Sequence, residues 1–307
     1  MSCAALACAA CLGCLNGGHR EAATAHVSAL GSFGRNPGQF ASPRAVAIGP
    51  GGEIAATDKT GRIQIFDPSG NLAARWTMPD TDKGTPTGFS FAPDGSLLIA
   101  DTHYHRIMKY SPSGELLDSF GTYGEGPGKF IYPTDVAVGS DGFIYVAEYG
   151  KNDRVQKFDA AYGFVAEWGG HGTEPGKLRR PMGLALDRAG HVYVADAVNH
   201  RIQKFTTEGR LVLAWGRHGK ALGELKYPYD VDVDPDGRVV VCEYGNCRVQ
   251  RFTPQGQPLD AFGGPGRALG ELSSPWSLAA ASDGRIFVAD MLNHRILVVG
   301  PKALRKG

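Results

Sequence analysis

The sequence predicts an all-β fold, a six-bladed β-propeller closed by its N-terminal strand, and three observations lead to that prediction. First, a Pro-x-x-hydrophobic segment recurs with successive spacings of 43, 47, 48, 47 and 47 residues. Its six copies begin at Pro43, Pro86, Pro133, Pro181, Pro228 and Pro275. Second, a glycine turn such as Asp141-Gly142 follows each start, which indicates a β-hairpin with a type I′ turn. Third, each repeat has room for four short strands and lacks a segment of helical period, as propeller blades do.

The elements of a repeat follow one another in a fixed order, which the third repeat illustrates. Its first strand begins at Pro133, and its second β-rich run ends with an acid, Glu148. A short loop leads to a third strand that begins with Arg154, and a second glycine turn precedes a fourth strand that ends in Trp-Gly. The acid and the arginine recur in all six repeats as Asp58 and Arg62, Asp101 and Arg106, Glu148 and Arg154, Asp196 and Arg201, Glu243 and Arg248, and Asp290 and Arg295.

We expect these six acid–arginine pairs to be structural. A charge-assisted contact between the end of the second strand and the start of the third would fix the hairpin in every blade. The alternative is a charged ring that binds a metal or an anion. The presence of the pair in every repeat favours the structural interpretation, because a ligand site rarely needs six identical copies.

The N-terminal strand is expected to close the ring. The sixth repeat ends with a third strand at 295–300 and lacks a fourth. The segment 27–34 precedes the first repeat and is similar in sequence to the fourth strand at 116–121. Pairing of the two ends would remove the open sheet edges that otherwise invite aggregation.

The chain divides into a leader at 1–15, a linker at 16–26, the propeller at 27–300 and a tail at 301–307. The leader is apolar, has no basic residue and is shorter than the roughly 20 residues that span a bilayer. Its end is similar to that of a bacterial lipoprotein signal, so a lipid on Cys14 is the one membrane attachment that the sequence leaves open. The prediction is an exported protein that is periplasmic, envelope-anchored or extracellular. A mis-assigned start is the alternative and would make the protein cytoplasmic.

The charge balance argues against a general binder of nucleic acid or of an anionic membrane. The 307 residues include 32 Lys and Arg and 31 Asp and Glu, a net charge of +1, whereas phosphate-backbone binders usually carry a basic excess. The 42% of hydrophobic residues describe a folded, core-forming chain. Two local basic segments at 177–180 and 217–220 leave RNA binding as an alternative.

The repeat itself resembles a known family. The segments Pro133-Thr-Asp-Val-Ala-Val, Asp141-Gly-Phe-Ile-Tyr-Val-Ala-Glu and Arg154-Val-Gln-Lys-Phe-Asp are similar to the NHL repeat. The resemblance covers residues 27–300 and implies a six-bladed propeller. It also implies a choice of functions, because NHL proteins include RNA-binding and protein-binding modules, extracellular sensors and the peptidyl-hydroxyglycine amidating lyase. In that lyase, histidines directly after the first-strand prolines hold zinc.

The positions that match those zinc histidines carry other residues in this chain. They are Arg44, Thr87, Thr134, Met182, Tyr229 and Trp276. Tyr149 and Tyr244 resemble the catalytic tyrosine of the lyases in loop position, but a tyrosine without the metal does not make the site. We therefore expect no catalysis and no cofactor. The alternative is a lyase or hydrolase at the central channel that depends on zinc or calcium.

A calcium-loop pattern is a second metal candidate. Asp232, Asp234, Asp236 and Glu243 have the spacing of an EF-hand loop. That loop needs flanking helices, whereas strands are expected on both sides here, and an extended segment 238–242 would carry Glu243 away from the aspartates. The pattern therefore does not predict a calcium site.

The favoured function is a non-catalytic, monomeric platform that binds a protein, a peptide or a small ligand at the face around the channel mouth. In a propeller, the loops between second and third strands share this face with the loops that lead into the next blade. Their amphipathic side chains suit a binding surface. The candidates are Tyr149, Tyr229, Tyr244, Trp276, His103, His105, His200, His294 and Arg44. The alternative is that these are ordinary exposed loop residues.

Two further features concern the loops. Cys242 and Cys247 flank one loop between a second and a third strand, and an oxidising compartment would permit a disulfide, which the hairpin geometry leaves open. One apolar residue in each of five glycine-rich loops between blades is expected to anchor its loop: Phe40, Phe130, Leu178, Leu225 and Leu272.

Overall fold

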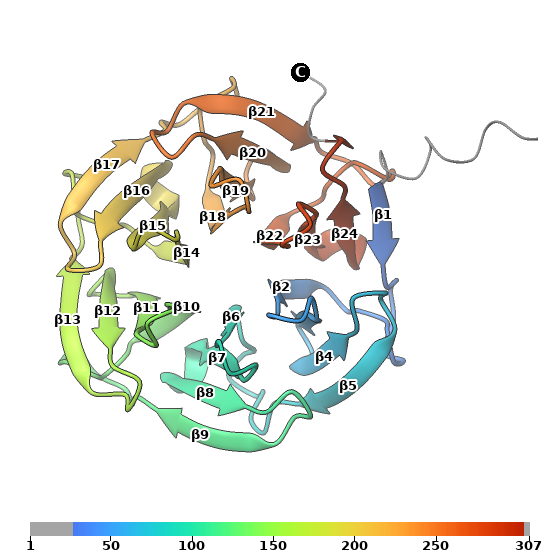
Figure 1. Cartoon of the computed structure of the whole chain (residues 1–307), viewed down its shortest axis with the longest axis horizontal. Helices are drawn as coiled ribbons and strands as arrows, with labels where there is room; N and C mark the ends of the chain where they lie inside the picture. Colours follow the sequence, from blue (N-terminus) through green and yellow to red (C-terminus); the bar gives the residue numbers. More distant parts are fainter. Residues whose placement is uncertain (1–26, 304–307) are drawn as a thin grey trace, which may run out of the picture.

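The structure is a computed structural model that describes residues 27–303, and it forms a ring of six four-stranded antiparallel sheets around a central opening (Figure 1). The predicted all-β class and the six-bladed propeller are thereby confirmed. The predicted leader at 1–15 with Cys14, the linker at 16–26 and the last four residues of the tail lie outside the described residues. In the described part of the chain, no helix is long and apolar enough to cross a membrane.

Each blade contains four strands, of which the first faces the central opening and the fourth forms the outer rim (Figure 1). Blade 1 consists of β2 (Pro43–Ile48), β3 (Ile54–Asp58), β4 (Arg62–Phe66) and β5 (Leu72–Thr77). Blade 2 consists of β6 (Gly88–Phe91), β7 (Leu97–Asp101), β8 (Arg106–Tyr110) and β9 (Leu116–Phe120). Blade 3 consists of β10 (Tyr132–Val138), β11 (Ile144–Tyr149), β12 (Arg154–Phe158) and β13 (Phe164–Gly169).

The second half of the ring repeats the same order. Blade 4 consists of β14 (Pro181–Leu186), β15 (His191–Asp196), β16 (Arg201–Thr206) and β17 (Leu211–Trp215). Blade 5 consists of β18 (Pro228–Val233), β19 (Val239–Glu243), β20 (Arg248–Phe252) and β21 (Pro258–Gly263). Blade 6 consists of β22 (Pro275–Ala280), β23 (Ile286–Asp290), β24 (Arg295–Val299) and β1 (Val27–Leu30). Single 3-10 turns join second and third strands in blades 2, 4 and 6, namely η2 (Thr102–Tyr104), η3 (Ala197–Asn199) and η4 (Met291–Asn293).

The N-terminal strand closes the ring as predicted. β1 pairs antiparallel with β24, with Val27 opposite Val299 and Leu30 opposite Ile296. Leu30 also packs against the apolar cluster between blades 6 and 1, and Val27 packs against the cluster between blades 5 and 6. β1 is therefore the fourth strand of blade 6, and it also makes apolar contacts at two blade interfaces.

The hairpins between first and second strands form in all six blades, but their turns differ from the type I′ turn that the Asp-Gly pairs suggested. In blade 2, the amide of Gly95 donates to the carbonyl of Ala92 at 2.9 Å, and the amide of Ala92 donates to the carbonyl of Ser96 at 2.8 Å. Gly95 has a φ of 81°, whereas Asp94 is not among the residues with positive φ. This is a three-residue loop in which one left-handed glycine follows the turn, so each hairpin requires a single glycine.

The core is divided into six apolar clusters, and each lies between two adjacent blades. In the cluster between blades 2 and 3, for example, Leu98 of β7 and Val146 of β11 are 2% and 0% exposed. The five predicted loop anchors are all fully buried, and Phe130 is one of them. Each anchor also forms a parallel bridge with a residue at the start of its own loop, as Phe130 does with Tyr123.

The six predicted acid–arginine pairs all form ion pairs, and every one of the six carboxylates is 0% exposed. In blade 3, Glu148 accepts hydrogen bonds from Arg154 Nε at 2.6 Å and from the backbone amide of Ile131 at 2.7 Å. Arg154 in turn donates to the carbonyls of Gly126 and Lys129, both at 3.1 Å. The pair therefore holds the loop that enters the blade as well as the hairpin on which it lies.

A glutamine two residues after the arginine extends this network in four blades, at Gln64, Gln156, Gln203 and Gln250. In blade 3, Gln156 accepts from the amide of Gly128 at 2.9 Å and donates to the carbonyl of Lys129 at 2.8 Å. It also donates to the carboxylate of Glu148 at 3.0 Å. Each entry loop thus gains backbone hydrogen bonds to buried side chains in place of bonds within a regular element.

Blade 2 departs from this arrangement. Asp101 pairs with Arg106 at 2.9 Å, but one of its carboxylate oxygens is buried and has no hydrogen-bond partner. Arg106 donates to Asp80 at 2.7 Å, and the glutamine position is occupied by Met108. In this blade the acid therefore holds its hairpin but does not hold the entry loop.

Removal of the closing strand tests the ring directly. We expect a chain that begins at residue 35 to melt more than about 10 °C below a chain that begins at residue 27, because β24 loses its partner and two interfaces lose an apolar side chain. Thermal unfolding followed by circular dichroism measures the difference, and light scattering detects association through the open edge. Equal melting temperatures for the two chains would contradict ring closure by β1.

Candidate functional site

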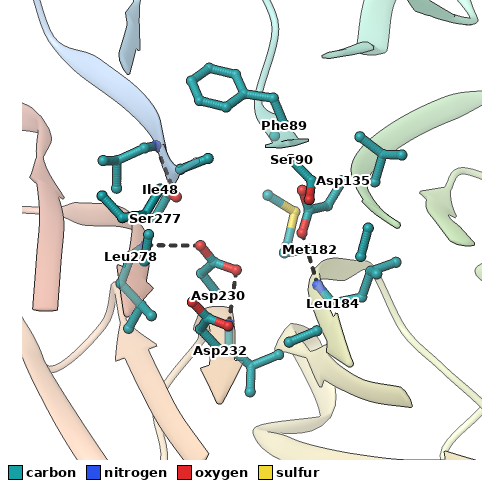
Figure 2. Close-up of a pocket in the computed structure, with 18 of the residues that line it drawn as sticks. Ile48, Phe89, Ser90, Asp135, Met182, Leu184, Asp230, Asp232, Ser277 and Leu278 are labelled. Atoms are coloured by element: carbon teal, nitrogen blue, oxygen red, sulfur yellow. Dashed lines mark hydrogen bonds between the residues drawn. The ribbon is translucent and has the colours of Figure 1, made fainter. Parts of the chain in front are cut away.

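The central channel contains a cavity of about 260 Å³ that is lined by the first strands of all six blades. Three carboxylates project into this cavity, from Asp135 on β10 and from Asp230 and Asp232 on β18 (Figure 2). Its lining includes no lysine, arginine or histidine. The interior of the channel is therefore acidic.

These carboxylates also connect neighbouring blades. Asp135 accepts from the amide of Leu184 at 2.9 Å and Asp230 from the amide of Leu278 at 2.8 Å (Figure 2). Asp232 accepts from the amide of Ala280 at 2.8 Å. The inner strands of adjacent blades belong to separate sheets, so these bonds use amides that no ladder satisfies. Each of these three channel carboxylates thus links two adjacent blades and also lines the cavity.

Glycines on the preceding blades make room for two of these carboxylates. A Cβ atom added to Gly88 would lie 2.3 Å from a carboxylate oxygen of Asp135. A Cβ atom added to Gly183 would lie 2.2 Å from a carboxylate oxygen of Asp230. The acids and the glycines therefore occur as matched pairs on successive inner strands.

The pKa values of the channel carboxylates are raised, and burial is the largest cause. Burial raises the pKa of Asp230 to about 7 and that of Asp232 to about 6. The pKa of Asp135 is raised well above its usual value by burial and then by the charge of Asp230. The amides that donate to these groups act in the opposite direction, but they do not offset the loss of water.

Aromatic rings gather at the channel mouth on the side of blades 5 and 6. Tyr229 stacks on Tyr244 with centroids 4.5 Å apart, and Trp276 meets Tyr229 edge to face at 5.0 Å. The guanidinium of Arg44, from blade 1, lies 4.9 Å from the centre of the Trp276 ring. Four of the predicted binding residues, Arg44, Tyr229, Tyr244 and Trp276, are thus connected by ring contacts and a cation–π contact at one part of the mouth.

A second aromatic group lies on the side of blades 2, 3 and 4. Tyr149 stacks on Tyr132 with centroids 5.0 Å apart, and His103 approaches Tyr132 at 6.0 Å. The guanidinium of Arg180, from the loop that enters blade 4, lies 5.1 Å from the centre of the Tyr149 ring. This group repeats the combination of stacked rings and an arginine.

Charge interactions connect the two groups. Burial raises the pKa of Tyr149, and the positive charges of Arg180 and Arg44 both oppose that rise. Burial also raises the pKa of Tyr229, and Arg180 again opposes it. Burial lowers the pKa of His103, and the charge of Arg44 lowers it further. We call the eight side chains together the mouth ring: Arg44, His103, Tyr132, Tyr149, Arg180, Tyr229, Tyr244 and Trp276.

The other three predicted histidines lie in the same kind of loop but make structural hydrogen bonds. His105, His200 and His294 all have left-handed backbones directly before a third strand. The Nδ1 atom of His294 accepts from the amide of Ser42 at 3.0 Å, and that of His200 accepts from the amide of Tyr227 at 3.1 Å. These bonds set His200 and His294 apart from the mouth ring, whereas the ring of His105 lies 5.8 Å from that of Tyr132. The part of all three histidines in binding stays a prediction.

Sequence reasoning did not identify Tyr132, Asp135 or Asp230 as site residues. It named Arg180 only as part of the basic segment 177–180, and Asp232 only as part of the calcium-loop pattern. Tyr132 and Arg180 directly precede first-strand prolines, two positions before the residues that were considered. Asp135 and Asp230 both lie two positions after such a proline, immediately beyond a register shift in the first strand. The signal that could have found them is the position relative to the proline, compared across the six repeats.

The structure also bears on the metal and disulfide candidates. Among residues 27–303, no three His, Cys, Asp or Glu side chains form a group that could hold a metal ion. The calcium-loop pattern is dispersed, because Asp232 faces the channel whereas Glu243 pairs with Arg248. Cys242 and Cys247 are both free, and Cys242 is fully buried, with burial raising the pKa of its thiol.

The raised pKa values predict how stability depends on pH. A carboxyl whose pKa is higher in the folded state than in the unfolded state favours folding at low pH, and that contribution is lost as the pH rises. For Asp230 the loss extends from about pH 4 to about pH 7. We expect Asp230→Asn to gain stability relative to the natural chain across this window, measured as melting temperature by calorimetry. Exposed Asp82→Asn is the control, and a constant difference between the Asp230→Asn variant and the natural chain from pH 4.5 to pH 8 would contradict the assignment.

Comparisons with known proteins agree with the fold. A family model described as the NHL repeat matches residues 130–158, 178–205, 225–252 and 272–299, and no curated protein matches the sequence. A solved virginiamycin B lyase from Staphylococcus aureus is 14% identical, with a TM-score of 0.63 over 90% of this chain and 99% of that chain. A solved gluconolactonase from Xanthomonas campestris is 15% identical, with a TM-score of 0.63 over 85% and 86%. At these identities the two structures share only the fold with this chain, and the matched repeats coincide with blades 3 to 6. The chain therefore contains four NHL repeats, which form blades 3 to 6 of a six-bladed β-propeller.

Proposed function

We propose that this protein is a non-catalytic binding module whose mouth ring holds a peptide segment of a partner protein, a free peptide or a small organic ligand. One observation carries the proposal. The Nε atom of Arg44 is buried at the mouth and has no hydrogen-bond partner. A buried cationic donor without an acceptor costs free energy, and a ligand that supplies the acceptor for Arg44 Nε would remove that cost. The proposal keeps the exported, monomeric state expected from the sequence.

The composition of the mouth ring supports binding. Tyr and Trp offer large contact areas at little cost in conformational entropy, and such residues with Arg dominate binding energy at recognition sites. Tyr229, Tyr244 and Trp276 pack against one another, so each ring is already restrained before a ligand arrives. A preorganised aromatic surface at the opening of a cavity is a general property of ligand sites.

The chemistry of the ring favours binding over turnover. Burial raises the pKa of Tyr149 and of Tyr229, so both phenols stay protonated near neutral pH and act as hydrogen-bond donors rather than bases. The shared fold does not decide the question, because the two solved relatives named above are a lyase and a lactonase, and one fold supports many functions. The proposal therefore rests on the side chains of the ring.

RNA binding receives less support from the basic segments. Lys177 donates to the carbonyl of Gly169 at 3.0 Å, and Arg217 pairs with Glu224 at 2.9 Å. Two of the cations in the basic segments 177–180 and 217–220 are therefore already engaged. A band-shift assay at low salt would reveal phosphate contacts if these segments bind RNA.

Ligand-observed NMR with a library of aromatic and aliphatic fragments tests the proposal. We expect aromatic fragments to receive saturation transfer from the natural protein and to lose most of it in the double variant Tyr149→Ala and Trp276→Ala. Tyr123→Ala is the matched control, because Tyr123 is an aromatic residue of an entry loop, 68% exposed and outside the mouth ring. Equal loss in the control, or none in the double variant, would contradict the proposal. Turnover of a hydroxyglycine peptide would contradict its non-catalytic part.

A further inference from the structure

The mouth ring contains two arginines that lack an acidic partner, whereas the arginine that begins the third strand of each blade is paired with a buried acid. Arg62, Arg154 and Arg248, for example, are each bound to a buried carboxylate. Within residues 27–303, Arg44 and Arg180 take part in no ion pair, and their contacts are with the faces of Trp276 and Tyr149. The mouth therefore carries positive charge that no side chain of the described chain neutralises.

The two guanidinium groups act on one small region. Arg180 lies 5.1 Å from the centre of the Tyr149 ring and Arg44 lies 4.9 Å from the centre of the Trp276 ring, and the positive charges of both oppose the rise in the pKa of the Tyr149 phenol. Burial lowers the pKa of Arg44, which reflects the cost of holding its charge away from water. An anion at the mouth would be attracted by both guanidinium groups, and an anion beside Arg44 would supply the acceptor that its Nε atom lacks.

We infer that the ligand of the mouth ring carries a carboxylate, which binds between Arg44 and Arg180. An aromatic group attached to this carboxylate packs on the rings. This inference rests on the proposed function. The planar guanidinium fork matches a carboxylate in geometry, and such charge-assisted bonds are stronger than neutral ones. The protonated phenols of Tyr149 and Tyr229 provide further donors. The ligand is either a small aromatic acid or the C-terminal aromatic residue of a peptide, because both present the same groups.

The acidic channel sets how deep this ligand enters. Asp135, Asp230 and Asp232 line the cavity below the mouth, and the cavity lining has no cation. A carboxylate that moved inward would leave the arginines and enter a cavity whose lining offers no cation, so its charge would lose both water and its ion-pair partners. The charge pattern along the channel axis therefore keeps the carboxylate at the mouth.

Isothermal titration calorimetry at low ionic strength tests this inference with matched acids and amides. The small probes are N-acetylphenylalanine and its amide, and the peptide probes are Ala-Ala-Ala-Ala-Phe with a free or an amidated C-terminus. We expect at least one acid to bind about tenfold more tightly than its amide, as a bidentate charged contact would provide. The pair with the greater difference identifies the source of the carboxylate.

Variants assign the preference to the two arginines. We expect the double variant Arg44→Gln and Arg180→Gln to bind acid and amide equally, and the variant Arg44→Lys and Arg180→Lys to keep a smaller preference. Arg217→Gln is the matched control, because it removes one positive charge from another entry loop and should keep the full preference. Circular dichroism of each variant verifies that it is folded.

Each outcome has a distinct meaning. Equal affinity of the natural protein for acid and amide would overturn the inference and leave the proposed binding function standing. Binding of neither probe would overturn the inference, and the proposed function would fall as well if the fragment library also gave no hits. A preference that survives in the double glutamine variant would overturn the placement of the carboxylate at Arg44 and Arg180.

Discussion

The structure depends on a buried carboxylate at the end of each second strand. This group accepts hydrogen bonds from the arginine that begins the third strand and, in five of the blades, from the backbone of the loop that enters the blade. A carboxylate that is 0% exposed would be very costly alone, so its partners are required rather than optional. In blade 3, Glu148 thereby fixes both a hairpin and an entry loop with one side chain.

This network explains why the mouth of the channel is a defined surface although it consists of loops. Loops without such contacts are mobile and position side chains poorly. Here Arg180 follows Arg179, whose amide donates to the buried Asp196 at 2.7 Å, and Tyr244 directly follows the buried Glu243. The residues that form the mouth ring are therefore attached to the rigid part of each blade. Loops of this kind can hold a preorganised site.

The sequence was sufficient for the fold because each signal is local and occurs six times. The prolines, the turn glycines and the acid–arginine pairs each recur at one place per blade, so an error in a single repeat does not change the count. Closure by β1 was predictable because the missing fourth strand and its replacement are both visible in the chain. The turn type was not, since Asp-Gly occurs in more than one kind of hairpin and only the hydrogen bonds distinguish them.

The site was harder to predict, and the reasons are physical. Alternation along a strand assigns faces only while the register is regular, and a register shift lies between Pro133 and Asp135 and again between Pro228 and Asp230. Counting alternate residues along the strand therefore cannot show that the side chains of these acids point into the channel. Arg180 has a φ of 55°, a left-handed conformation that the sequence of a non-glycine residue does not announce. The part of Tyr149 in the mouth ring could be predicted from the sequence, because its expected position in a loop between second and third strands indicated the correct face.

The central claim is that the buried acids stabilise the ring by holding the entry loops, and blade 2 provides an internal comparison. Glu148 binds both its arginine and its entry loop, whereas Asp101 binds its arginine and leaves one oxygen without a partner. The decisive measurement is the free energy of unfolding in urea for Glu148→Gln and for Asp101→Asn. We expect a loss of about 2 kcal/mol or more for Glu148→Gln and less than about half of that loss for Asp101→Asn, because only the first substitution weakens the hold on a loop. Equal losses, or a larger loss for Asp101→Asn, would contradict the account.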